Sequence, residues 1–176
     1  IELKYIPMLP DGTLDMDAAR ELIGPRTKLL SVTATSNALG SIVPVAELSA
    51  LAKAQGAVVL VDAAQHAPHM PLDLEALGAD FVAFSSHKML GPTGVGVLWG
   101  RMELLEAMDP FMGGGDMILT VTMEQSTWAD VPSKFEAGTP NIGGVVGFGA
   151  ALDYLSAIGM HNVRAHELEI TDYALR

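Results

Sequence analysis

Short apolar runs alternate with helical patterns along most of the chain, and this alternation predicts its fold class. Three runs have the length and the β-branched content of strands: Thr27–Thr33, Ala57–Val61 and Asp80–Phe84. A fourth, Val95–Trp99, follows a turn rich in glycine and proline. The order strand, helix, strand, helix predicts an α/β fold with a mostly parallel sheet flanked by helices.

Apolar residues spaced at the helical period predict the helices that connect these strands. Asp15 is placed to cap a short helix that ends at Ile23, and Gly56 closes a helix over Val45–Gln55. The uniformly apolar run Ala57–Val61 predicts a central strand covered on both faces. Further helices are expected over Leu72–Leu77, Met102–Ala107, Gly143–Ile158 and Asn162–Arg176, with a long excursion from Gly113 to Lys134.

Composition narrows the classes of protein to which the chain can belong. The 176 residues include no cysteine, which excludes a disulfide, a thiolate zinc site and a thiol nucleophile among them. A net charge of −11 argues against a nucleic-acid surface or an anionic membrane patch. No apolar run approaches the roughly 18 residues of a membrane span. The chain begins at Ile1 in a strand-like segment that ends by Pro7, which predicts a piece of a longer protein.

Two segments rich in chemically active side chains directly follow two of the predicted strands. Asp62 and Gln65 come after the first, and Ser85, His87 and Lys88 come after the second. Ligands of α/β sheets bind beyond the carboxyl ends of the strands, so neighbouring strands would bring these groups to one crevice. A lysine there can form a Schiff base with pyridoxal phosphate (PLP), and a buried carboxylate can keep the pyridine nitrogen protonated.

Other interpretations of the same residues remain open at this point. Lys88 can be a solvated surface lysine, or it can form a structural ion pair with Asp62 at the strand edge. Asp62, His66 and His69 have the spacing of a helical metal triad, but two prolines in this segment interrupt the helix that the triad needs. A metal-dependent hydrolase and a non-catalytic binding module are therefore the competing functions from other classes.

Longer strings of residues give a more specific signal. The strings Val61–Gln65 and Phe84–Gly96 closely resemble the group II cysteine desulfurases, which belong with the selenocysteine lyases to the class V aminotransferase family of fold-type I PLP enzymes. The resemblance continues, in the same order along the chain, through Ser36–Gly40, Gly113–Ile118 and Lys134–Asn141. It therefore covers nearly the whole chain. By this resemblance, the fold is part of the large domain of a fold-type I PLP-dependent transferase.

The resemblance also implies a domain division and a role for each matched position. Residues 1–158 would belong to the PLP-binding large domain, and residues 159–176 would form a helix leading toward a C-terminal domain absent from this chain. Lys88 would form the Schiff base with PLP and later move protons. The other implied contacts are Asp62 with the pyridinium nitrogen, Gln65 with the phenolic oxygen, Ser85 and His87 with the phosphate, Asn37 with the cofactor and the substrate carboxylate, and Gly138 and Thr139 with the phosphate of the other subunit's cofactor.

The implied activity converts L-cysteine to L-alanine and passes the sulfur to an enzyme cysteine, then to a sulfur-acceptor protein of iron–sulfur cluster assembly. The implied enzyme is a homodimer, and we expect it in the cytoplasm. Alternatives within the family are a selenocysteine lyase acting on L-selenocysteine, a kynureninase-like enzyme and an aminotransferase-like epimerase. The family's persulfide-forming cysteine and its substrate-carboxylate arginine lie outside the matched segment, so we expect the 176 residues alone to be inactive. Ala63 and Ser86 stand where glycine is usual in relatives.

Overall fold

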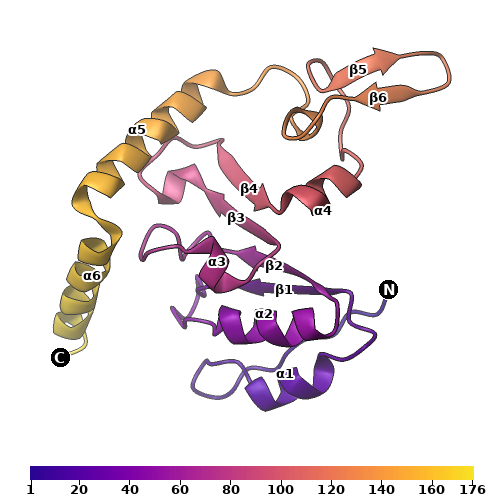
Figure 1. The fold of residues 1–176 in the computed structure, drawn as a ribbon. Coiled ribbons are helices and arrows are strands. Elements are labelled where there is room, and N and C mark those ends of the chain that lie inside the picture. The colour runs from indigo at the N-terminus through magenta and orange to yellow at the C-terminus, as the bar shows by residue number, and fades with distance from the viewer.

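A four-stranded sheet with the strand order β1–β2–β3–β4 forms the centre of the computed structural model, which describes all 176 residues (Figure 1). The first three strands are parallel, and β4 runs antiparallel to β3. The predicted α/β fold with a mostly parallel sheet flanked by helices is confirmed. The four strands are β1 (Leu29–Thr33), β2 (Val58–Asp62), β3 (Phe81–Ser85) and β4 (Gly96–Gly100).

Six α-helices and two short 3-10 helices complete the main body. Every predicted helix, and each strand predicted between Thr27 and Trp99, is present with bounds within two residues of the prediction. Asp15 caps α1 as expected, because its Oδ1 accepts hydrogen bonds from the backbone N–H groups of Asp17 and Ala18. The helices are α1 (Met16–Leu22), α2 (Val45–Ala54), α3 (Leu74–Leu77), η1 (Ser86–Lys88), α4 (Met102–Ala107), η2 (Ser133–Phe135), α5 (Ile142–Ile158) and α6 (Met160–Ala174).

Two segments of the chain differ from the predicted secondary structure. The excursion after residue 113 contains an antiparallel hairpin of β5 (Ile118–Val121) and β6 (Ser126–Trp128), which lies apart from the main sheet (Figure 1). The hairpin strands are short and mostly exposed, so they lack the long apolar run by which the other strands are found. The predicted strand before Pro7 is absent, and only an isolated bridge joins Met8 to Leu14.

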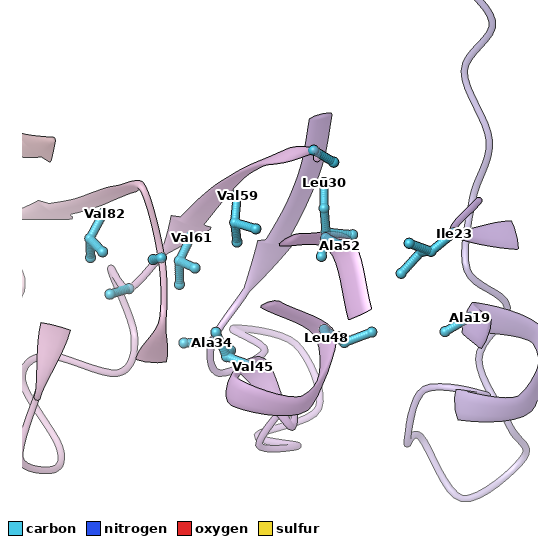
Figure 2. Packing of buried hydrophobic residues seen from close by; sticks show 13 residues of the cluster. Ala19, Ile23, Leu30, Ala34, Val45, Leu48, Ala52, Val59, Val61 and Val82 are labelled. Carbon is cyan, nitrogen blue, oxygen red and sulfur yellow. The ribbon is translucent and has the colours of Figure 1, made fainter. Parts of the chain in front are cut away.

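The main core lies between the sheet and helices α1 and α2. Val59 and Val61 of β2 are fully buried and point toward Val45 and Leu48 of α2 (Figure 2). Full burial of a valine or leucine side chain stabilises a fold by about 1.5–3 kcal/mol. This packing fixes which face of β2 points inward and therefore fixes the register of its last residue, Asp62.

The opposite face of the sheet is much less covered, contrary to the prediction for β2. Leu29 of β1 and Leu98 of β4 are each 56% exposed. Val58 and Leu60, which alternate with the buried valines of β2, are only partly buried. The apolar run Ala57–Val61 therefore forms a strand with only one fully packed face, because α1 and α2 both pack on the same side of the sheet.

The two C-terminal helices meet at a sharp bend. No single helix is long and apolar enough to cross a membrane, and α5 and α6 pass that test of length and composition only when they are taken together. They are bent by 72° at the break between them. Both helices run along one side of the molecule (Figure 1).

Asp80 supports the amino end of β3 with a carboxylate that is almost completely buried. Its Oδ2 accepts a hydrogen bond of 2.8 Å from the Val59 N–H, and its Oδ1 lies 3.1 Å from Lys53 Nζ. We expect Asp80→Ala to lower the free energy of unfolding by about 2–3 kcal/mol, because the buried Val59 N–H loses its acceptor. Urea denaturation measures this loss. Asp80→Asn retains an oxygen acceptor and should cost clearly less, and equal losses for the two variants would contradict this account.

Candidate active site

The pairing of β2 with β3 brings two of the predicted site segments to one edge of the sheet. Asp62, the last residue of β2, pairs in parallel register with Ala83 of β3. Ser85 ends β3 two residues later, and η1 continues directly with His87 and Lys88. The predicted adjacency of these strands is confirmed, so the carboxylate and the amine belong to the same end of the sheet.

The Asp62 backbone bonds to the segment after β1, and its side chain bonds to the turn that follows β2. Its carbonyl oxygen accepts a hydrogen bond of 2.8 Å from the Ala34 N–H, and its Oδ1 accepts one of 2.8 Å from the Ala64 N–H. The sequence argument assumed a buried carboxylate, but Asp62 is exposed. The reason is the alternation of β2, because Asp62 lies on the same face as Val58 and Leu60, which the helices do not cover, whereas its neighbours Val61 and Ala63 are fully buried.

Lys88 ends η1 and is partly buried. The ion pairs of the chain include neither Lys88 nor Asp62. The structural ion pair that the sequence left open is therefore not formed. The Lys88 amine and the Asp62 carboxylate occupy the same sheet edge without being engaged by each other.

Helix α5 packs closely against the turn that follows Lys88. Leu90 and Gly94 adopt positive φ angles of 62° and 80°, which reverse the chain into β4. A Cβ on Gly144 would lie 2.6 Å from Val95, and one on Gly147 would lie 2.8 Å from Pro92. The absence of side chains at these two glycines of α5 therefore lets the helix pack closely against the turn beside Lys88.

Asn37 and Gln65 lie on the segments that follow β1 and β2. Together they line a cavity of about 370 Å³, whose far wall is formed by α6. Arg164 and Glu167 are the charged residues that α6 contributes to it. The cavity thus joins two predicted cofactor residues to the C-terminal helix.

His66 and His69, which the sequence placed in a candidate metal triad, make other contacts. His66 Nε2 donates to the carbonyl oxygen of Pro71 at 3.3 Å, which leaves Nδ1 to accept from the Thr35 hydroxyl at 3.2 Å. His69 Nδ1 donates to Oε1 of Glu167 at 2.6 Å. His66 therefore joins the segments after β1 and β2, and His69 joins the turn of Gln65 to α6.

Sequence reasoning missed the bond between His69 and Glu167. The two residues are separated by 98 positions, and neither belongs to a local motif that would indicate the pairing. Only the approach of α6 to the turn that follows β2 brings them together.

Gly138 and Thr139 lie outside the cluster at the sheet edge. Gly138 has a φ of 82°, and its N–H donates to the carbonyl oxygen of Gly115 at 2.9 Å. Thr139 is exposed in the same loop, just before α5. The loop is thus attached to the segment that leads into the β5–β6 hairpin.

Comparisons with known proteins agree with this fold. The family model of aminotransferase class V matches residues 1–176. A cysteine desulfurase of Klebsiella pneumoniae is 54% identical over 175 residues, which cover 99% of this chain and 43% of the relative. A cysteine desulfurase of Haloferax volcanii is 53% identical over 173 residues, which cover 98% of this chain and 41% of the relative.

Solved structures of cysteine desulfurases have the same architecture as this chain. The apo structure of a cysteine desulfurase from Thermococcus onnurineus matches 98% of this chain and 43% of its own chain, with a TM-score of 0.93 and 40% identity. The fold is that of part of the large domain of fold-type I PLP-dependent transferases, as predicted. The chain belongs to the aminotransferase class V family. It spans about 42% of the length of the curated relatives that it matches.

Burial and the Arg164 charge lower the pKa of His66 below its ordinary value of 6.5, with burial the larger cause and the Pro71 hydrogen bond opposing it. The unfolded chain therefore binds more protons than the folded one as the pH falls through 6.5. We expect the stability that neutral His66 contributes at pH 7 to be lost between about pH 6.5 and the lower folded pKa. His66→Gln should flatten the pH dependence of the unfolding free energy in this window.

The matched control for this pH profile is His161→Gln, because His161 is exposed on α6. It should leave the slope of stability against pH unchanged. An unaltered slope in the His66→Gln variant, measured by urea denaturation from pH 5 to pH 8, would contradict the assignment.

Proposed function

We propose that this chain is the Lys88-bearing part of a PLP-dependent cysteine desulfurase, which converts L-cysteine to L-alanine. One observation carries the proposal. Asp62 and Lys88 stand at the carboxyl ends of two neighbouring strands, in a chain about half identical to proteins named cysteine desulfurase. Ligands of α/β sheets bind at this end of the strands, which supports a cofactor site there.

The donor set at this edge fits the functional groups of PLP. An amine at Lys88 suits the aldehyde, and a carboxylate at Asp62 suits a protonated pyridine nitrogen. An amide at Gln65 can donate to the phenolic oxygen. A hydroxyl at Ser85 and an imidazole at His87 can donate to phosphate oxygens.

Bound PLP would supply an electron sink next to the α-carbon of the substrate. The Lys88 amine would attach the cofactor and, when free of it, would act as the general base that takes the proton from the substrate α-carbon. The Asp62 carboxylate holds a proton at the pyridine nitrogen, so that the sink remains effective. Asn37, on the segment after β1, binds and orients the substrate carboxylate.

The sulfur step requires a thiol that these residues do not contain. The C–S bond of L-cysteine breaks, and the sulfur joins an enzyme thiolate as a persulfide while the β-carbon is protonated to the methyl group of L-alanine. The chain has no cysteine, so we propose that the thiol comes from a part of the protein outside these 176 residues. A sulfur-acceptor protein of iron–sulfur cluster assembly would then receive the persulfide sulfur.

The organisation of the whole enzyme is also part of the proposal. Residues 1–158 would belong to the PLP-binding domain, and residues 159–176 would lead toward a further domain. The bend between α5 and α6 supports a boundary near residue 159. We propose a cytoplasmic homodimer in which Gly138 and Thr139 contact the cofactor phosphate of the other subunit. Their exposed loop, which lies outside the Lys88 cluster, is consistent with that role.

Lys88→Ala tests the cofactor attachment in the full-length protein. We expect the variant to lose the borohydride-reducible chromophore and to lower L-alanine formation at least about 100-fold, because both the attachment and the general base are removed. Lys28→Ala is the matched control, since Lys28 is an exposed lysine at the opposite end of β1. If the Lys88→Ala protein keeps a reducible chromophore on another lysine, the assignment is wrong.

A mixed dimer tests the proposed contact across the subunit interface. We expect Thr139→Ala to weaken PLP binding about tenfold through loss of one hydrogen bond to a charged group. A dimer of one Lys88→Ala subunit and one Thr139→Ala subunit should regain a single site of unaltered PLP affinity, because the intact lysine and the intact threonine then meet across the interface. A single site that remains weakened would place Thr139 in its own subunit's site instead.

A further inference from the structure

Ser86 connects both ends of the turn that carries Lys88. It is completely buried, at the start of η1 and two residues before the lysine. Its N–H donates to the carbonyl oxygen of Val95 at 3.1 Å, and its own carbonyl oxygen accepts from Met89 at 2.8 Å and from Gly91 at 3.0 Å. All three partners belong to the same turn.

The Ser86 hydroxyl adds a fourth contact, which a glycine at this position would not make. Its Oγ donates to the carbonyl oxygen of Pro92 at 2.8 Å. This bond ties the first residue of η1 to the middle of the turn, six residues later. By the family resemblance, glycine is usual at the position of Ser86, and a glycine there would leave the Pro92 carbonyl oxygen without this donor.

Gly91 leaves the space that this hydroxyl occupies. A Cβ on Gly91 would overlap Ser86 Oγ and would lie 3.0 Å from Cδ2 of Phe148 on α5. Gly91 does not have a positive φ, so space rather than backbone conformation requires glycine here. Ser86 cannot yield easily, because moving its hydroxyl would break the bond to Pro92.

We propose that Ser86 is a positioning residue for Lys88. Its hydroxyl restrains the turn by bonding to Pro92, and it can do so only because Gly91 has no side chain to occupy the same space; we call this pair of residues the clamp. The role in positioning rests on the proposed function, since it assumes that Lys88 carries the cofactor. A fixed turn restricts the range of positions of the Lys88 amine, and small displacements of a reacting group slow its reaction strongly.

The first test measures the mobility of the turn in the full-length protein. Ser86→Ala removes the hydroxyl and keeps the Cβ. We expect hydroxylamine to release PLP from this variant about three- to tenfold faster than from the unaltered protein. In the cofactor-free protein, the Met89 and Gly91 amides should exchange their hydrogens faster by a similar factor.

Ser49→Ala is the matched control. Ser49 is an equally buried serine, in α2, but its hydroxyl has no hydrogen-bond partner. It should change neither the hydroxylamine rate nor the exchange of the turn. If Ser86→Ala alters these two rates no more than Ser49→Ala does, the positioning role is wrong.

A double-mutant cycle tests the coupling directly. Gly91→Ala should be strongly destabilising alone, and its effect on the melting temperature and the hydroxylamine rate should be at least about threefold smaller in the Ser86→Ala background. If Gly91→Ala alone gives no folded protein, recovery of folded protein by the second substitution supports the clamp. Equal effects in both backgrounds, or failure to recover, would overturn it.

The two proposals fail in different ways. An unaltered protein with no hydroxylamine-sensitive chromophore would overturn the proposed function and, with it, the positioning of a cofactor by Ser86. Unchanged amide exchange in the cofactor-free Ser86→Ala protein would overturn the clamp alone and would leave the proposed function intact.

Discussion

Strands β2 and β3 pair in parallel through three residue pairs, and the last pair joins Asp62 to Ala83. This pairing holds the segments that begin at Asp62 and Ser85 at one edge of the sheet. Val61 and Val82 next to this last pair are fully buried, so the same contacts that stabilise the core also fix the register. A slip by one residue would turn the buried side chains toward the uncovered face of the sheet. The position of the site is therefore determined by hydrophobic packing, although the site itself is polar.

The turn between η1 and β4 shows how the chain combines a restricted backbone with a reactive side chain. The turn packs against α5, whose small residues let the backbone approach closely at Gly144 and Gly147. Phe148 of the same helix belongs to a second, smaller core cluster with Met89. Lys88 therefore lies between the buried residues Ser86 and Met89, while its own amine stays free of ion pairs. Rigid support around a mobile functional group is a common requirement of catalytic sites.

The sequence predicts the main elements well, because each strand and helix of the sheet domain has a strong local pattern. The AVVLV run before Asp62 and the FVAF run before Ser85 place both site segments correctly. The pattern could not show that one sheet face is left partly open, since an apolar strand residue looks the same whether or not a helix covers it. The hairpin of β5 and β6 was missed because its strands are short and exposed.

The site was predictable only as far as it depends on strand ends. Asp62 was expected to be buried, yet it is exposed because it lies on the sheet face that no helix covers, and no local pattern describes that covering. The contacts of His66 and Ser86 arise from tertiary packing and have no signature in the sequence.

The bond between His69 and Glu167 has a consequence for the order in which the molecule assembles. It joins residues 98 positions apart, and closing so long a segment costs more chain entropy than any contact within one βα unit. We therefore expect this contact to form after the local elements are in place, because the entropy of closing the long segment must be lost before the contact is gained. During synthesis, the turn that carries Gln65 therefore receives its last restraint only when α6, at the far end of this chain, has been made.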